Sequence, residues 1–252
     1  MSDAWEIYDR LIEPIPAGVR VDSAGVGEKW CWVLSSEGGL GVALKMPLTT
    51  RPARLPWTEL TGRDLREVAQ LAKSWNFLEA GLGMAAINAW WGQPERVAAH
   101  GYQPCVENNW ARTFHAFQDQ TVGKRVAIIG HFPFAPAALP HVAELAILER
   151  FPVAGDYPDP ASEYLLPAMD YVFITGSVFV NKTAPRLLEL SRAAHTVLVG
   201  PSTPAAPWLH EYGVDELTAF VTHSPAPMSR ILESGVHDGW YAYGHRMQHL
   251  PT

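Results

Sequence analysis

Two kinds of hydrophobic spacing divide the first part of the chain. Apolar residues at helical spacing over 5–12 predict a short amphipathic helix that must end near Pro14. Short runs rich in Val, Trp and Leu occupy 19–27, 29–35 and 40–44, and glycine-containing turns separate them. This pattern is typical of strands joined by hairpins, so we predict a three-stranded antiparallel meander after the first helix.

Two helices are predicted in the segment that follows. Thr61, with Asp64 three positions later, forms an approximate capping box that would start the first helix. The second helix, over 74–91, contains many Gly and Ala residues, which allow another backbone to approach closely. We therefore predict that the second helix is buried.

The predicted buried helix carries a single carboxylate, Glu79, among Ala, Gly and Leu. A carboxylate in such surroundings needs partners or a raised pKa, as general acids and metal ligands have, but a structural bond to a loop is an equal alternative. Asn76 shares a face with Glu79, whereas Asn88 lies half a turn round the helix. A structural role is the simpler expectation for Asn88, because buried amides commonly satisfy backbone groups.

The pattern of the second half differs, because continuous apolar runs alternate with helical stretches. The runs lie in 123–132, 170–176 and 195–204 and are typical of buried parallel strands. Their alternation with helices indicates βαβ units and a doubly wound sheet. The predicted class is α/β, with an α+β domain over 1–115 and a Rossmann-like domain over 116–252. The G-x-G-x-x-G fingerprint is absent, which removes the usual pyrophosphate cradle.

The composition of the chain mainly excludes classes of protein and of partner. The 252 residues are 48% hydrophobic and 18% charged, as in a globular rather than a disordered chain. A net charge of -7 argues against nucleic acid as a partner. The chain shows neither a signal-peptide pattern nor an apolar run near the roughly 20 residues that span a membrane, so we expect a cytoplasmic protein. Cys31 and Cys105 are too few for a disulfide framework or a four-thiolate zinc site.

Polar residues follow the predicted strands of the second half and should converge on one edge of the sheet. They are His131, Thr175, Gly176, Ser177, Asn181, Lys182, Thr183, Ser202 and Thr203. Thr203 precedes Pro204, which is typical of a helix N-cap, so capping is the simpler explanation for Ser202 and Thr203. A helix N-terminus beside Lys182 would also suit a phosphate or carboxylate, which makes an anion site the alternative.

Acidic residues gather in one stretch, ERFPVAGDYPDPASEYLLP. Glu149 and Asp156 could ligate a divalent metal ion, whereas Asp159 before a proline is typical of an N-cap. His245 and His249 are spaced i, i+4 and could face a metal ion if the end of the chain were helical. A solvated C-terminal tail is the simpler prediction for these two histidines.

Several long stretches resemble one protein family. They include WEIYDRLIEPIP, KSWNFLEAGLGMAAINAWW, GKRVAIIGHFPF, VLVGPSTPAAPWLHEYGVDEL and the segment from LERFPVAGDYP to LELSRAA. These stretches are similar to the bacterial and archaeal family named for a proposed role in heavy-metal chelation, over nearly the whole chain. The resemblance implies an N-terminal domain like that of enolase, a C-terminal Rossmann-like domain and an active site in the cleft between them.

The resemblance also implies which polar residues belong to that cleft. They are Asn76, Glu79, His131, Glu149, Asp156, Thr175, Asn181, Lys182 and Thr183. A serine is expected in the family's helix where this chain has Gly81, so any role of that hydroxyl is lost here.

Three functions are compatible with these residues. In the first, the protein chelates a divalent metal ion, or a small ligand linked to one, through Glu79, His131, Glu149 and Asp156. In the second, it is an enzyme that acts on a small anionic metabolite or nucleotide, with Glu79 or His131 as general acid or base. In the third, it is a ligand-binding sensor without turnover. A small molecule or metal ion is the expected partner in each case, and exposed Trp residues would permit a homodimer.

Overall fold

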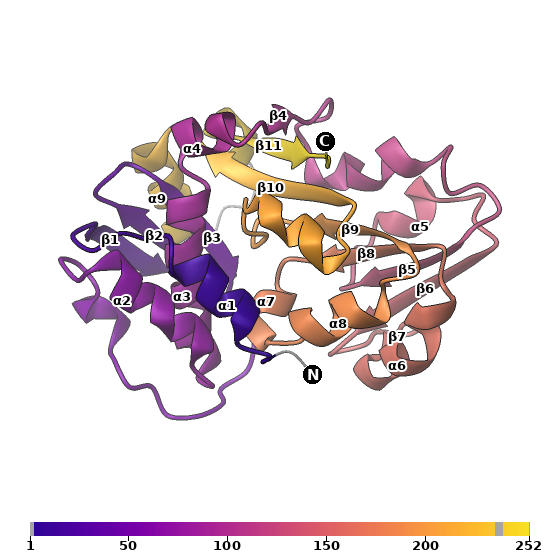
Figure 1. The fold of residues 1–252 in the computed structure, drawn as a ribbon, viewed down its shortest axis with the longest axis horizontal. Coiled ribbons are helices and arrows are strands. Elements are labelled where there is room, and N and C mark those ends of the chain that lie inside the picture. The colour runs from indigo at the N-terminus through magenta and orange to yellow at the C-terminus, as the bar shows by residue number, and fades with distance from the viewer. Residues whose placement is uncertain (1–2, 235–238, 252) are drawn as a thin grey trace.

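A three-stranded sheet forms early in the chain, as Figure 1 shows for the computed structural model, which describes residues 3–234 and 239–251. Its strands are β1 (Val21–Val26), β2 (Trp30–Ser35) and β3 (Leu40–Leu44). Neighbouring strands are antiparallel in the order β1-β2-β3. The predicted meander is therefore confirmed.

Helix α3 (Phe77–Trp91) packs against this small sheet. Every residue of α3 except Leu78 is buried, as predicted from its small residues. The approach of strand to helix requires glycine at Gly41, because a Cβ there would lie 2.1 Å from the backbone nitrogen of Ala89. The glycines and alanines of this region thus bring α3 onto the sheet.

The other helices of the first part are short, and one of them begins later than predicted. Asp64, rather than Thr61, is the N-cap of α2 (Leu65–Ala69), and its carboxylate accepts a hydrogen bond from the backbone N–H of Arg66 at 2.9 Å. The same carboxylate accepts from the N–H of Gly18, and these bonds lower the pKa of Asp64. The remaining helical elements are α1 (Glu6–Ile12), η1 (Trp57–Glu59), η2 (Gln70–Lys73), α4 (Pro94–Ala99) and η3 (Trp110–Phe117).

The second sheet has the strand order β4-β11-β10-β9-β8-β5-β6-β7. Its strands are β4 (Gln103–Pro104), β5 (Arg125–Ile129), β6 (Glu144–Glu149), β7 (Tyr157–Pro158), β8 (Tyr171–Thr175), β9 (His195–Val199), β10 (Glu216–Thr222) and β11 (Gly244–His249). Strands β5 to β10 pair in parallel, and β11 is antiparallel to β10 and β4. The predicted α/β class with a mostly parallel sheet is confirmed.

The course of the chain creates a switch point in this sheet. After β5 the chain adds β6 and β7 on one side, and then crosses back to place β8 on the other side of β5. Crossover connections therefore leave the carboxyl ends of β5 and β8 in opposite directions. In open α/β sheets, the crevice at such a point is where ligands bind.

Apolar side chains of the parallel strands alternate between two cores. Ala127 and Ile129 of β5 join the larger core, which also contains α1, α3 and α7 (Val178–Asn181), whereas Val126 and Ile128 face the smaller one. Within the larger core, the buried hydroxyl of Tyr8 donates to the carbonyl of Phe179 at 2.8 Å. The first part of the chain is thus fastened to one face of the large sheet. The boundary between residues 115 and 116 stays a prediction.

Three local predictions in the second half are wrong. Thr203 caps no helix, because the next helical turn begins four residues later. The Asp159 carboxylate accepts from Arg150 Nε at 2.7 Å instead of capping the turn that follows. The predicted solvated tail, with His245 and His249, is the edge-proximal strand β11.

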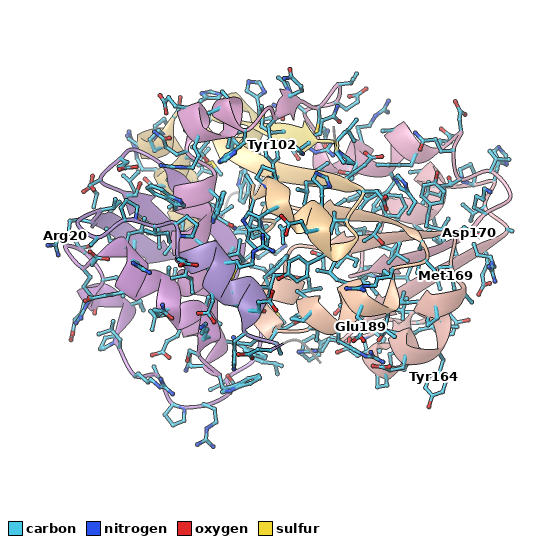
Figure 2. All side chains as sticks on the ribbon, viewed as in Figure 1. Arg20, Tyr102, Tyr164, Met169, Asp170 and Glu189 are labelled. Carbon is cyan, nitrogen blue, oxygen red and sulfur yellow. The ribbon has the colours of Figure 1, made fainter. Side chains whose placement is uncertain are left out.

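Short helical segments connect the strands of the large sheet (Figure 1). They are α5 (Ala135–Ala138), η4 (Asp159–Ala161), α6 (Ser162–Leu165), η5 (Leu166–Ala168), α8 (Ala184–Leu190), η6 (Pro207–Tyr212), α9 (Pro225–Ser234) and η7 (Trp240–Ala242). The segment PAPMSRILESG predicts a helix that ends in a glycine, and this residue, Gly235, lies outside the described residues. Figure 2 shows Tyr164 projecting outward from α6. Within 3–234 and 239–251, every helix is too short or too polar to cross a membrane.

Candidate functional site

A pocket of about 550 Å³ lies where the small sheet meets the carboxyl ends of the large sheet, and we call it the switch-point pocket. The small sheet contributes the β1–β2 turn and the end of β3. The large sheet contributes the ends of β5, β6 and β8 and the start of the α7–α8 segment. The lining residues are Glu28, Lys29, Leu44, Lys45, Met46, Pro47, Ile129, Gly130, His131, Leu148, Glu149, Arg150, Phe151, Val153, Asp159, Ser162, Thr175, Ser177, Val178, Asn181, Thr183 and Leu187.

Gly176 lies in close contact with the loop after β9 and does not line the pocket. A Cβ on Gly176 would lie 2.3 Å from the backbone nitrogen of Thr203, so the loops after β8 and β9 touch through their backbones. Gly176 was predicted as a ligand-binding residue. Its close contact gives it a structural task, which is to let the two strand-end loops pack together.

Glu149 organises the loop that follows β6. One of its oxygens accepts a hydrogen bond from the backbone N–H of His131 at 2.9 Å, and the other accepts from the N–H groups of Arg150 and Phe151 at 2.6 and 3.2 Å. The first bond ties the end of β6 to the segment after β5, and the other two hold the turn that follows Glu149. The carboxylate therefore faces the pocket but is largely occupied by the backbone.

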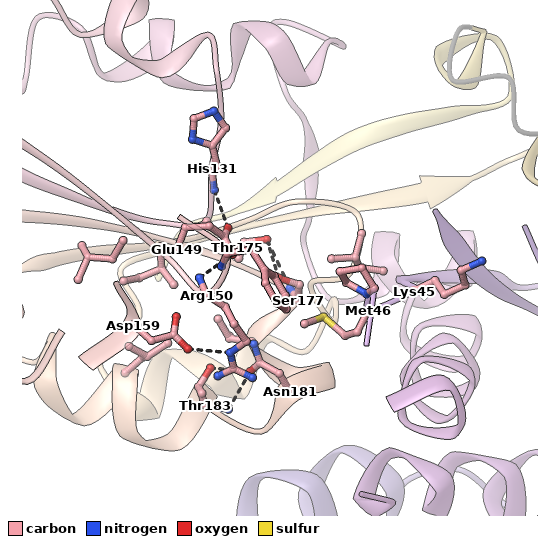
Figure 3. A pocket seen from close by; sticks show the side chains of 18 of the residues that line it. Lys45, Met46, His131, Glu149, Arg150, Asp159, Thr175, Ser177, Asn181 and Thr183 are labelled. Carbon is pink, nitrogen blue, oxygen red and sulfur yellow. Dashed lines mark hydrogen bonds and ion pairs between the residues drawn. The ribbon is translucent and has the colours of Figure 1, made fainter. Parts of the chain in front are cut away.

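His131 and Asp156 form a pair at the rim of the pocket. His131 Nδ1 lies 2.9 Å from Asp156 Oδ2, and the same oxygen accepts from the N–H of Val153 at 3.2 Å. Figure 3 shows the imidazole extending away from Arg150 and Asn181. The structure thus joins three of the predicted metal ligands, Glu149 included, as hydrogen-bonded neighbours.

Glu79 lies apart from these residues, and its predicted place in the same ligand set is wrong. Its side chain is 1% exposed and does not line the switch-point pocket. One oxygen accepts from the backbone N–H groups of Arg54 and Leu55, and the other accepts from the hydroxyl of Ser74. Glu79 therefore has a structural role: its carboxylate holds a loop against the start of α3.

Asn76 holds the same loop. Its Oδ1 caps α3 by accepting from the N–H of Glu79 at 3.0 Å, and its Nδ2 donates to the carbonyl of Arg51 at 2.6 Å. The hydroxyl of Thr50 adds two bonds: it accepts from the N–H of Phe77 and donates to the carbonyl of Trp75. A second hollow of about 710 Å³ lies between this loop and 74–77. Asn76 borders that hollow and not the switch-point pocket.

Five of the predicted strand-end residues line the switch-point pocket: His131, Thr175, Ser177, Asn181 and Thr183. Asn181 Oδ1 accepts from both the N–H and the hydroxyl of Thr183, at 3.1 and 2.6 Å. The Ser177 hydroxyl is 3.3 Å from that of Thr175. Their placement follows from the topology, because parallel strands end at the same edge of the sheet.

Three other predicted anion ligands do not reach this pocket. Lys182 has a left-handed backbone with φ 67°, its ammonium donates to the carbonyl of Val180, and burial lowers its pKa to about 8. The Ser202 hydroxyl accepts from the N–H of Leu44 at 2.9 Å and so joins the two sheets. Thr203 is 2% exposed. None of the three lines the switch-point pocket, and their grouping around an anion stays a prediction.

The cationic residues that line the pocket were not among the predicted site residues. Arg150 follows Glu149 and lines the pocket beside Asn181, and the small sheet supplies Lys29 and Lys45. The Lys45 ammonium is occupied by the carbonyl of Gly27 at 3.0 Å. A signal for Arg150 existed, because a position just after the second strand of a doubly wound sheet borders the ligand crevice.

The donor atoms do not fit a heavy-metal site made of side chains alone. No group of three or more His, Cys, Asp and Glu side chains within 3–234 and 239–251 is arranged to hold a metal ion. Cys31 is a buried residue of β2, where burial raises its pKa to about 12, and neither cysteine lines the switch-point pocket. Soft metal ions prefer thiolates, which this pocket does not offer.

Two family models match the chain. A model described as "Putative heavy-metal chelation" (DUF364) matches residues 113–249, and another with the same description (DUF4213) matches residues 8–91. An uncharacterized protein of Methanocaldococcus jannaschii is 27% identical over 164 residues, which make up 62% of this chain and 60% of that protein. The chain thus matches less than two thirds of the length of that relative.

Two solved structures share the whole fold. A DUF364 protein of unknown function from Desulfitobacterium hafniense DCB-2 has 40% identity and a TM-score of 0.89, with 98% of this chain and 99% of the other covered. Another DUF364 protein of unknown function, from Pyrococcus horikoshii, has 24% identity and a TM-score of 0.80 over the same shares. The second similarity concerns the fold alone.

Proposed function

The chain belongs to the DUF364 family, and from this premise we propose that it binds a small organic ligand in the switch-point pocket and receives metal ions as part of that ligand. The observation that carries the proposal is the pocket itself. It has the volume of a small-molecule site, lies at the switch point of a doubly wound sheet and combines apolar walls with a few polar groups.

The hydrogen bonds of Glu149 and Asp156 support the proposal that metal ions arrive as part of the ligand. Glu149 accepts three backbone bonds, and Asp156 is shared by a backbone N–H and His131. A metal ion bound by these side chains alone would compete with these bonds for the oxygens of Glu149 and for Oδ2 of Asp156. A metal ion that arrives in a chelate brings its own oxygen or nitrogen ligands, which the polar wall of the pocket can recognise.

A second candidate function is an enzyme that acts on the same ligand. The observation in its favour is the contact between His131 Nδ1 and Asp156 Oδ2, which fixes the ring and leaves Nε2 for proton transfer. Glu79 has no part in this candidate, because its oxygens are bonded to the loop. Cytoplasmic location and a homodimer stay predictions.

Mass spectrometry and elemental analysis of protein purified without an affinity tag or chelator test the proposal. We expect a small molecule at about one per chain, with metal only when that molecule is present. Protein that emerges empty is titrated with zinc, citrate and zinc citrate, and the chelate should bind more tightly than zinc alone. Stoichiometric metal without an organic ligand, or tighter binding of zinc alone, would contradict the proposal.

A pocket-filling variant locates the ligand. Ser177→Trp places an indole in the pocket, whereas Ser229→Trp places one on α9, outside it. The first variant should lose the ligand and the second should keep it. Retention by Ser177→Trp, with folding verified by circular dichroism, would show that the ligand lies elsewhere. For the enzymatic candidate, His131→Gln should abolish turnover while leaving ligand affinity within about threefold.

A further inference from the structure

Arg150 is held in place at the base of the switch-point pocket. It directly follows β6, and its Nε donates to the Asp159 carboxylate at 2.7 Å. Its side chain is 25% exposed. Among the described residues, none accepts a hydrogen bond from either terminal nitrogen of this guanidinium. The fixed Nε leaves these two nitrogens as a rigid fork of donors.

Asn181 presents a further donor beside this fork. Its Oδ1 is taken by the N–H and hydroxyl of Thr183, which fixes the amide plane. Its Nδ2 has no acceptor in the part of the chain that the structure describes. Figure 3 shows the Arg150 guanidinium and the Asn181 side chain pointing toward the same space, next to Thr183. Two different segments of the chain thus direct N–H groups at one place.

The other cations near the pocket are already occupied or lie at its edge. The ammonium groups of Lys45 and Lys182 donate to backbone carbonyls, of Gly27 and Val180. Lys29 is exposed at the mouth, in the turn between β1 and β2. Arg150 is therefore the cation whose free donors face the interior. A partly buried guanidinium with free donors is stabilised by an anion, and its fork matches the two oxygens of an oxyanion.

We propose that Arg150 and Asn181, with Thr183 holding the latter, form a subsite for a carboxylate or phosphate group of the ligand. The subsite rests on the proposed function of the pocket. Apolar side chains, Ile129, Leu148 and Leu187 among them, also line the pocket and can contact the body of a ligand. The ligand class is an organic oxyanion with an apolar body, rather than a free inorganic ion or a neutral molecule.

Calorimetric titration with matched probes tests the subsite. Benzoate and phenyl phosphate carry the oxyanion on an aromatic body, benzyl alcohol is the neutral counterpart of benzoate, and inorganic phosphate lacks the body. The wild type should bind both aromatic anions more tightly than the alcohol and than inorganic phosphate. Equal affinity for benzyl alcohol, or no binding of either aromatic anion at millimolar concentration, would overturn the subsite.

Arg150 variants separate charge from geometry. Arg150→Gln should weaken anion binding at least about tenfold and leave binding of benzyl alcohol within about twofold. Arg150→Lys keeps the charge without the fork and should have intermediate affinity. Lys124→Gln removes an exposed charge that does not line the pocket and should change affinity by less than about twofold. Circular dichroism verifies that each variant is folded, because Arg150 also bonds Asp159.

The Ser177→Trp variant distinguishes failure of the subsite from failure of the pocket. If it abolishes binding of all the probes while Arg150→Gln changes nothing, the pocket stands and the subsite is refuted. If Arg150→Gln weakens the anions while Ser177→Trp leaves every probe unaffected, the anions bind outside the pocket. That result would overturn the proposed function and the subsite together.

Discussion

Replacing Glu79 by alanine should destabilise the fold and leave the switch-point pocket intact. The buried carboxylate accepts bonds from two backbone N–H groups, of Arg54 and Leu55, and from the hydroxyl of Ser74. A bond to a charged group contributes about 1.5–3 kcal/mol. Because the loop is exposed and its freed N–H groups can reach water once it opens, we expect a total loss of about 3–5 kcal/mol in the free energy of unfolding.

Glu79→Gln should cost much less. The glutamine oxygen can still accept from both backbone N–H groups, and its amide can donate to the hydroxyl of Ser74, which then lacks an acceptor for its own proton. We expect a loss of about 1–1.5 kcal/mol. Glu67→Ala on the exposed side of α2 is the matched control for removing a carboxylate, and it should stay within about 0.5 kcal/mol of the wild type.

Urea unfolding, followed by circular dichroism and tryptophan fluorescence, measures these differences. Hydrogen exchange at the amides of Arg54 and Leu55 tests the mechanism, because both should exchange much faster in Glu79→Ala. A loss below about 1 kcal/mol, or unchanged protection of these amides, would refute the assigned role. A stable Glu79→Gln variant that loses ligand binding or turnover would return Glu79 to the functional site.

The sheets could be predicted from the sequence because their patterns are local and repeated. Apolar runs separated by glycine turns indicated the meander, and continuous apolar runs between helices indicated the parallel sheet. The starts of helices were less predictable. Thr61 and Thr203 both fit capping patterns, but Asp64 caps α2 and no helix begins at Thr203. Several polar residues near a turn fit the same pattern, and tertiary contacts decide which one is used.

The pocket could be predicted where it depends on topology alone. Thr175, Asn181 and Thr183 line it because they follow a strand that ends at the switch point. Glu79 could not be placed in this way. Its partners are backbone groups of a loop 24 and 25 residues earlier, and backbone N–H groups leave no mark in the sequence.

The positions of Lys182 and Arg150 also depended on contacts that the residue types do not reveal. Both are cations beside the strand ends, but a left-handed backbone at Lys182 and its bond to the Val180 carbonyl keep its ammonium out of the pocket. A residue other than glycine rarely adopts this conformation, so it could not be expected at Lys182 from residue types alone. Arg150 faces the pocket because Asp159 holds its Nε, and Asp159 itself had been assigned to a helix cap.

Two further predictions test the packing around the site and the edge of the large sheet. Gly176→Ala should lower both the melting temperature and the ligand affinity. The new Cβ would lie 2.3 Å from the backbone nitrogen of Thr203 and must displace that loop. Unchanged affinity in calorimetry would refute the role of this contact in shaping the site. Burial, and then the neighbouring His210, lower the pKa of His249 from its ordinary value of 6.5, so the unfolded chain binds a proton more readily than the folded protein. The stability that depends on the neutral imidazole is present above pH 6.5 and is lost as the pH falls through the lowered pKa. Urea unfolding from about pH 7 to about pH 5 should show a smaller decline for His249→Asn than for the wild type or the exposed control His141→Asn. The same decline in all three proteins would mean that other groups set the acid sensitivity.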